Sequence, residues 1–387
     1  MRRISSILLI TIFLLCVSGC KGPNYLQKKY GVCKYDYYNY LDTISSITIE
    51  YKKNDITEKE VTTLLVSIND ILLNYEKEYS IEQTIFMKQN DISESTLMRV
   101  NENSGIAPIK VSSEFIALLE KAIDVSKITY NKFNPAIGAL SSLWNISKQS
   151  EYCDINNTCK IPSQNEIEHA KALIDVDNII IDKTNQTVFL KEENMKLDLG
   201  GIVKGYAADC IMDYLVKDCF TYIAVNLGGN IKTYGKSFLA NIYTQEATIV
   251  PISIENPDFN IYDRNTIMNV HCENMSIVTS GINKRYIEVW DEFTGTYKKY
   301  HHLLDPQTGY PATSNIKSVS IIGPSSLMCD GLSTGVYILG IEEGIQILNN
   351  TNYSAIIITN DLKIYIIGDV DYKLESNVDK VYQIINI

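Results

Sequence analysis

The sequence predicts an α+β fold, a single globular unit with mixed sheets and packed helices after an N-terminal signal and tether. Two long segments, residues 57–79 and 112–130, carry apolar side chains at helical spacing. Residues 44–51 alternate between apolar and polar side chains, as a half-buried strand does. No repeat, low-complexity tract or interdomain linker interrupts the chain, so we expect one folded domain over residues 41–387.

Composition and charge narrow the class of protein. At 387 residues and 45% apolar composition, the chain can bury a substantial core. The formal net charge is -11, and no long run of Lys or Arg occurs. Because contacts to phosphate backbones require clustered cations, these features argue against nucleic acid as the main partner.

The N-terminus predicts export and a lipid anchor. Arg2 and Arg3 precede an apolar run over residues 7–17, which is too short to span a bilayer but suits a signal-peptide core. The run ends in Val-Ser-Gly-Cys20, which resembles the lipobox of bacterial lipoproteins. We therefore expect a signal peptide over residues 1–19, lipid on Cys20, and a tether over residues 20–40 that leaves the domain outside the cytoplasmic membrane. An ordinary secreted protein or a buried apolar strand is the alternative.

The cysteines and histidines do not have the spacing of a zinc site. Nine cysteines include no CxxC pair, and of the four histidines only His301 and His302 are adjacent. Cys153 and Cys159 bracket a short polar loop and could form a disulfide in an oxidising compartment.

The middle of the chain contains a turn motif and several short strands. In KFNPAIGALSSLW, residues 132–144, Asn134 precedes a proline and is held extended with its amide free to bond, although a purely structural turn is the simpler interpretation. Residues 149–162 are polar and predict a surface loop. Strands are expected at residues 179–181, 187–190 and 195–199, with two more over 237–257.

Two glycine pairs follow predicted strands. In LDLGGIVKGYAAD, residues 197–209, a strand ending in Asp198 runs into paired glycines before a helix that begins at Lys204. Such a turn exposes backbone amides and carbonyls to a ligand, although it lacks the full glycine pattern of a nucleotide-binding loop and could be a simple strand-to-helix turn. AVNLGGNI, residues 224–231, is again a strand that ends in a glycine pair.

A hairpin is predicted before the last motifs. Residues 276–302 read as a strand, a polar turn, a second strand over 287–290, a hairpin near Gly295 and a third strand that ends at His301 and His302. LLDPQTGYP follows as a turn.

The junction between a strand and a helix near residue 323 carries oxygen ligands. The apolar run 319–322 is broken by Gly323 and Pro324, and Ser325 or Ser326 can cap the helix that follows. Asp330 and Thr334 lie four residues apart, on one face of that helix. One carboxylate and one hydroxyl suit Mg²⁺. Alternatively, Asp330 complements the helix dipole and Thr334 bonds back to its own helix.

Five of these motifs, taken in order, resemble the signature series of the FAD:protein FMN transferases, the ApbE-type lipoproteins. They are LDLGGIVKGYAAD, AVNLGGNI, VTSGINKRYIEV, YHHLLDPQTGYP and CDGLSTGVYILG. The resemblance covers about residues 41–348 and implies an ApbE-like, T-fold-related unit. It also implies an enzyme that uses Mg²⁺, cleaves FAD at its pyrophosphate and attaches FMN to a Thr of an extracytoplasmic acceptor protein, such as a membrane redox-complex subunit.

The resemblance assigns roles to individual residues. Asp330, Thr334 and the backbone oxygen of Gly201 would bind the metal. His301 and His302 match a pair of which one is implicated in catalysis, and a His has the pKa to accept a proton from Thr. We favour His302 as the base, with His301 as the alternative. FAD contacts are implied for Leu41, Asn134, Lys204, His302 and Leu303. The chain departs from the family at Leu41, Asp42, Asn134 and Cys329, where Met, Gly, Asp and Ala are commoner.

Two alternative functions remain open from the sequence. An FAD pyrophosphatase would use the same site but release FMN and AMP to water. A flavin-binding lipoprotein would hold FAD without turnover.

Overall fold

The structure, a computed structural model, describes most of the predicted domain. The described residues are 25–40, 43–156, 159–240, 246–258, 261–262, 264–282 and 285–387. The predicted signal peptide, Cys20 and Leu41 lie outside them. No helix within these ranges is both long enough and apolar enough to cross a membrane.

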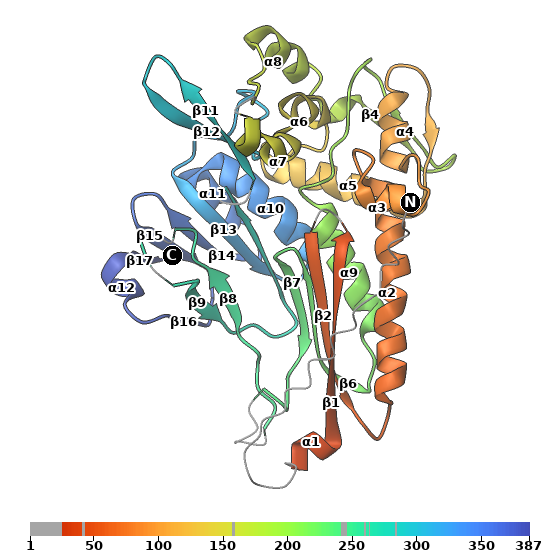
Figure 1. The fold of residues 1–387 in the computed structure, drawn as a ribbon, viewed down its shortest axis with the longest axis vertical. Helices are drawn as coiled ribbons and strands as arrows, with labels where there is room; N and C mark the ends of the chain where they lie inside the picture. Colours follow the sequence, from red (N-terminus) through yellow and green to blue (C-terminus); the bar gives the residue numbers. More distant parts are fainter. Residues whose placement is uncertain are drawn as a thin grey trace.

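One nine-stranded sheet runs through the molecule (Figure 1). Neighbouring strands are antiparallel except for the last pair, β15 and β17. In spatial order the strands are β1 (Tyr30–Tyr40), β2 (Thr43–Lys52), β6 (Phe220–Leu227), β7 (Asn230–Gly235), β10 (Ser276–Gly281), β13 (Ile316–Gly323), β14 (Ser354–Thr359), β15 (Lys363–Ile367) and β17 (Gln383–Asn386).

Three smaller sheets accompany the main one. Their strands are β3 (Ile109–Lys110), β5 (Thr187–Leu190) and β4 (Ile179–Asp182) in the first, β16 (Tyr372–Leu374), β9 (Thr266–Val270) and β8 (Ile252–Glu255) in the second, and the hairpin β11 (Tyr286–Asp291) and β12 (Thr296–His301).

The helices pack against these sheets. They are α1 (Tyr25–Lys29), α2 (Glu58–Tyr79), α3 (Ile85–Gln89), α4 (Thr96–Glu102), α5 (Ser113–Ile128), α6 (Gly138–Trp144), α7 (Ile146–Asn156), α8 (Gln164–Lys171), the 3₁₀ helix Val176–Asn178, α9 (Val203–Leu215), α10 (Ser326–Leu339), α11 (Ile341–Asn349) and α12 (Val378–Val381).

The long helices form as predicted. Thr57 caps α2 and forms a capping box with Glu60, and Ser112 caps α5 by accepting the Phe115 N–H. The apolar stripe of α2 includes the fully buried Ile68 and Leu72. Figure 1 shows α2 and α9 beside the β1–β2–β6 half of the sheet, where they enclose the largest core cluster.

The other half of the sheet is buried on both faces. Val319 and Ile321 of β13 belong to the core cluster that contains Leu332 of α10, whereas Ile322 belongs to the cluster under the β8–β9–β16 sheet. A strand covered on both faces needs apolar residues without alternation. This explains why Val319, Ile321 and Ile322 are all apolar, while the intervening Ser320 shares a hydrogen bond with the Thr279 hydroxyl of β10 at 2.7 Å.

The folded domain begins earlier than the predicted boundary at residue 41. Residues 25–40 are not a free tether, because they form α1 and β1, and β1 pairs with β2 from Tyr30 to Tyr40. Tyr37 is 1% exposed and donates its hydroxyl to the Leu65 carbonyl of α2 at 2.6 Å. Tyrosine favours strands that are buried on one face, and the polar residues between the tyrosines lie on the other face.

Three local predictions were wrong. The polar segment 149–162 begins as helix α7 rather than as a loop. Residues 195–199 form only a single bridge, Ile137 to Lys196, because the Leu197 N–H and carbonyl pair with the Asn101 side chain at 2.7 and 3.0 Å. Of the two strands expected over 237–257, the described residues form only β8 and one bridge between Ser237 and Thr248.

Cys159 is disulfide-bonded, in line with the expected bridge, although the side chain of Cys153 lies outside the described part of the structure. The free cysteines among the described residues are Cys33, Cys210, Cys219, Cys272 and Cys329.

Candidate active site

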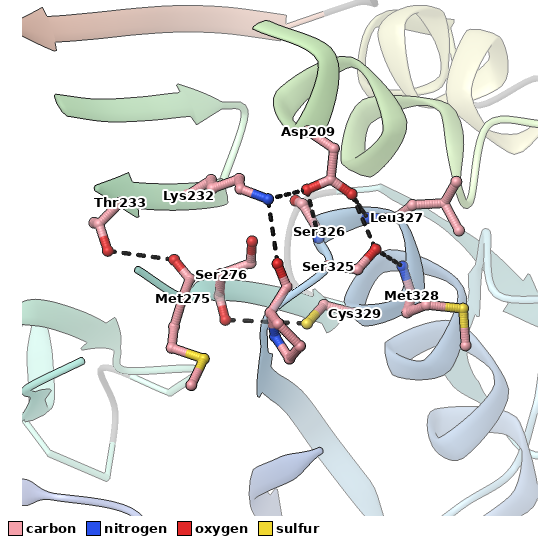
Figure 2. A network of polar contacts seen from close by, with 11 residues as sticks. Asp209, Lys232, Thr233, Met275, Ser276, Ser325, Ser326, Leu327, Met328 and Cys329 are labelled. Carbon is pink, nitrogen blue, oxygen red and sulfur yellow. Dashed lines mark hydrogen bonds and ion pairs between the residues drawn. The ribbon is translucent and has the colours of Figure 1, made fainter. Parts of the chain in front are cut away.

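The start of α10 is fixed to α9 and β7 by a polar network around Asp209 (Figure 2). The Asp209 carboxylate of α9 accepts hydrogen bonds from Ser325 Oγ (2.9 Å), Ser326 N–H (2.9 Å) and Leu327 N–H (3.0 Å). Lys232 of β7 forms an ion pair with Asp209 and donates to the Pro324 carbonyl at 3.2 Å. The first N–H groups of a helix lack intrahelical partners and carry partial positive charge, so a carboxylate there stabilises the helix start.

Asp330 lies one turn further along α10 and faces α9. It is 5% exposed, and its Oδ2 accepts a 2.8 Å hydrogen bond from the Gly205 N–H. A Cβ on Gly205 would come within 2.3 Å of the Ser326 carbonyl oxygen, so only glycine allows the two helices to approach this closely. The α9–α10 contact therefore sets the position of the carboxylate.

The environment of Asp330 favours a nearby cation. Burial raises the pKa of this carboxyl group, while the Lys204 charge and the Gly205 N–H act in the opposite direction. A buried carboxylate is costly unless it is paired or coordinates a metal ion. A cation bound beside Asp330 would stabilise its ionised form.

Thr334 and Gly201 meet at the same junction. The Thr334 Oγ1 lies 3.5 Å from the position that a Cβ on Gly201 would occupy, and the Phe133 ring lies 3.3 Å from it. Ser280 at the end of β10 contacts Thr334 Oγ1 at 3.4 Å and Ser333 Oγ at 2.8 Å. The structure thus places Thr334 beside Gly201, and Asp330 lies one turn before Thr334 on α10.

These residues fit a Mg²⁺ ion. A carboxylate, a hydroxyl and a backbone segment beside them supply hard oxygen atoms while leaving positions for water and phosphate. The described residues contain no cluster of three or more His, Cys, Asp or Glu side chains that could hold a metal. The buried Asn230 side chain also faces Asp330, and its amide N–H favours the ionised form of that carboxylate.

Lys204 connects the metal-ligand candidates to the histidines. Its Nζ donates to the Gly200 carbonyl at 3.3 Å, from the first turn of α9. Its positive charge contributes to lowering the pKa of both Asp330 and His302. The ammonium group therefore lies within electrostatic range of both groups, where it can also attract a phosphate.

His302 is oriented as a base. Its Nδ1 lies 3.1 Å from the Arg285 carbonyl oxygen, and because a carbonyl only accepts, Nδ1 carries the proton. The Nε2 atom then keeps its lone pair, and the ring is only partly buried. Burial and the nearby Arg285 charge lower the pKa of His302 to about 4, so this ring is neutral at physiological pH.

His301 is oriented differently. Its Nε2 donates to the Ala312 carbonyl at 2.9 Å, its ring meets Tyr337 of α10 edge-on at 5.7 Å, and the side chain is 6% exposed. Burial lowers its pKa to about 4. The contacts of His301 indicate that it joins the hairpin to α10, whereas the Nδ1 bond of His302 leaves its Nε2 unprotonated.

Of the remaining candidate FAD contacts, Asn134 and Leu303 make contacts within the protein itself. Asn134 is buried, and its Oδ1 accepts the Ala136 N–H at 2.9 Å, a bond that an Asp would also make. Leu303 is buried in the core cluster with Leu332 and Val336. Leu41 is outside the described residues.

The sequence predictions missed three residues of this site. Asp209 and Asn230 stand at or near the ends of two of the motifs, and Ser280 belongs to VTSG. Asp209 could have been found as an acidic residue that lies next to the buried Ala208 and Met212 on the predicted helix. Its partners, 116 to 118 residues away, were not visible from local spacing.

Comparison with known proteins agrees with the family resemblance of the sequence motifs. A profile of the ApbE family matches residues 41–357. An FAD:protein FMN transferase of Klebsiella pneumoniae (strain 342) is 32% identical over 296 residues, which cover 76% of this chain and 84% of that protein. An FAD:protein FMN transferase of Treponema pallidum (strain Nichols) is 30% identical over 260 residues, which cover 66% of this chain and 68% of that protein.

Solved structures confirm the α+β fold. The flavin transferase ApbE from Vibrio cholerae has a TM-score of 0.68 at 20% identity and covers 91% of this chain and 99% of its own. The ApbE protein of Thermotoga maritima also has a TM-score of 0.68, at 22% identity. The match covers 91% of this chain and 100% of that protein.

The lowered pKa of His301 predicts a pH-dependent stability. Its folded pKa of about 4 lies below the ordinary 6.5, so protons favour the unfolded chain and stability is lost as pH falls from 6.5 towards 4. The difference amounts to about 2 kcal/mol of unfolding free energy between pH 7.5 and pH 5. Urea unfolding should show that His301→Asn removes about this much of the pH-dependent loss, while His169→Asn, at an exposed site, leaves the loss unchanged. An unchanged loss in His301→Asn would contradict the assigned burial.

Proposed function

This chain belongs to the ApbE family, and from that premise we propose that it is a Mg²⁺-dependent FAD:protein FMN transferase. It cleaves FAD at the pyrophosphate and attaches FMN through a phosphoester to a Thr of an extracytoplasmic acceptor protein. The observation that carries the proposal is the convergence of Asp330, Thr334 and Gly201 at the α9–α10 contact, with Lys204 in electrostatic range of both Asp330 and His302.

The chain's own residues supply binding and orientation. Lys204 can donate to phosphate oxygens of FAD. Asp330, Thr334 and Gly201 would hold Mg²⁺, which supplies Lewis-acid stabilisation of charge on the phosphate oxygens. Since phosphoryl transfer depends mainly on positioning and electrostatics, this set requires little covalent chemistry from the protein.

His302 supplies the proton transfer. Its Nε2 takes the proton from the acceptor Thr hydroxyl as that oxygen forms a bond to the FMN phosphorus. The anhydride bond to the AMP phosphate breaks, and AMP leaves with the bridging oxygen. The bond from Nδ1 to the Arg285 carbonyl holds the ring in the tautomer that this step needs.

The Asp330 carboxylate should be essential for both cleavage and transfer. In Asp330→Asn the amide oxygen can still accept the Gly205 N–H, but the anchoring charge is lost, so the rate should fall by about 10²-fold to 10³-fold. Mass spectrometry of the products formed from FAD, Mg²⁺ and acceptor protein checks this.

The control is Asp213→Asn, at an exposed position on α9, which should keep full activity, and EDTA should abolish activity in the parent. Full activity of Asp330→Asn would refute the metal role. FMN released free, with no flavin on the acceptor, would identify a pyrophosphatase, and FAD retained intact would identify a binding protein.

The proton acceptor can be tested separately. His302→Asn keeps an amide donor for the Arg285 carbonyl but removes Nε2, so kcat should fall by about 10²-fold to 10⁴-fold while the dissociation constant for FAD changes little. His169→Asn is the matched control on the exposed side of α8. If His302→Asn retains kcat and His301→Asn loses it, the base has been assigned to the wrong histidine.

We also propose that Cys20 carries lipid and anchors the domain outside the cytoplasmic membrane, since Val-Ser-Gly-Cys20 resembles a lipobox. Cells fed a labelled fatty acid should label the parent protein, and the Cys20→Ala variant should stay unlabelled and leave the membrane fraction. Equal labelling of both proteins would exclude this anchor.

A further inference from the structure

We infer that the exposed face of the β11–β12 hairpin is the docking surface for the acceptor protein. The inference rests on the proposed transferase function and identifies the element that recognises the second substrate. Figure 1 shows the hairpin projecting from the body of the molecule, at the upper left. Its strand β12 ends at His301, directly before the proposed base His302.

One face of the hairpin is used for packing. Ile287 and Tyr300 are opposite each other in the ladder and are buried in the cluster that includes Trp144 of α6. The Trp144 and Tyr300 rings lie 5.5 Å apart. This face anchors the hairpin to the domain, so the hairpin is held in place by core packing.

The other face carries exposed aromatic side chains. Side chains alternate between faces along a strand, so Trp290 and Tyr297 share a face with His301. Trp290 is 49% and Tyr297 is 58% exposed, and their rings meet edge-on at 5.1 Å. Exposed, clustered aromatic residues are typical of protein interaction sites.

The turn at the tip carries a further exposed aromatic side chain. Phe293 is 97% exposed, although the turn around it is ordered by three bonds to Asp291: from the Phe293 N–H (2.9 Å) and the Thr294 N–H (3.3 Å) to the side chain, and from the Gly295 N–H (2.8 Å) to the carbonyl. An ordered turn that presents an almost fully exposed phenyl ring has no packing role within the described residues. The ring is available to a partner.

The geometry selects the acceptor as that partner. At its inner end the aromatic face reaches His301. The His301 ring packs against Tyr337 on α10, the helix that carries Asp330 and Thr334. The face therefore runs from the site outward along six residues of β12, about 20 Å. A protein whose Thr hydroxyl reaches His302 approaches along this rim. FAD needs no contact at such a distance from the phosphates.

The chemistry of the face indicates how the acceptor binds. Between the aromatic pair and the site, Glu288 lies opposite Lys299, so charges on this face offset each other. We therefore expect an apolar patch on the acceptor beside its Thr and little dependence of docking on ionic strength.

The test is a double variant, Trp290→Ser with Phe293→Ser, assayed with a purified extracytoplasmic domain of a membrane redox-complex subunit that contains its acceptor Thr. The KM for the acceptor should rise on the order of 10-fold to 100-fold, while the dissociation constant for FAD and the urea midpoint stay unchanged. Ile106→Ser, which removes an apolar side chain that is 72% exposed on another surface, should behave as the parent.

The outcomes separate this inference from the proposed function. If the parent transfers no flavin, the proposed function fails. If the parent transfers flavin and the double variant has the same acceptor KM, the docking inference is wrong. An unchanged KM together with lost self-association, or with lost binding to phosphatidylglycerol vesicles, would assign the face to a second copy of the chain or to a membrane surface and would equally overturn it.

Discussion

The position of α10 against α9 is the constraint on which the candidate site depends. Asp209 satisfies the free N–H groups at the start of α10, and one turn further on the Gly205 N–H binds Asp330. A longer side chain at Gly205 would separate the helices, because the Ser326 carbonyl occupies the space of a Cβ. The same contact therefore stabilises the fold and holds the Asp330 carboxylate against the first turn of α9, so changes in packing here also move the candidate metal ligand.

The two adjacent histidines show how similar residues acquire different roles. Both rings are neutral at physiological pH because burial lowers their pKa, yet each donates through a different nitrogen to a different carbonyl. His301 donates through Nε2 and is enclosed beside Tyr337. His302 donates through Nδ1 and keeps Nε2 unprotonated. Hydrogen bonding to the backbone, rather than a difference in pKa, distinguishes the proposed base His302 from the packing residue His301.

Local patterns predicted the parts of the molecule that local physics determines. The capped helices α2, α5 and α10 and the β11–β12 hairpin follow from side-chain period, cap residues and a glycine turn. The spacing of Asp330 and Thr334 likewise placed the two candidate ligands on one helical face. Long-range pairing was not predictable in this way. The Asn101 side chain occupies the hydrogen-bonding positions of Leu197. Tyr37 and Tyr40 of β1 are buried against α2, although the sequence of this segment reads as polar.

The central claim is that one acid, one hydroxyl and one glycine carbonyl hold a divalent cation at the α9–α10 contact. Anomalous diffraction from crystals grown with Mn²⁺, which accepts the same oxygen ligands, tests it most directly. The account predicts one strong peak within coordination distance of the Asp330 carboxylate, the Thr334 hydroxyl and the Gly201 carbonyl. A peak at other residues, or no peak at a Mn²⁺ concentration that supports turnover, would contradict it.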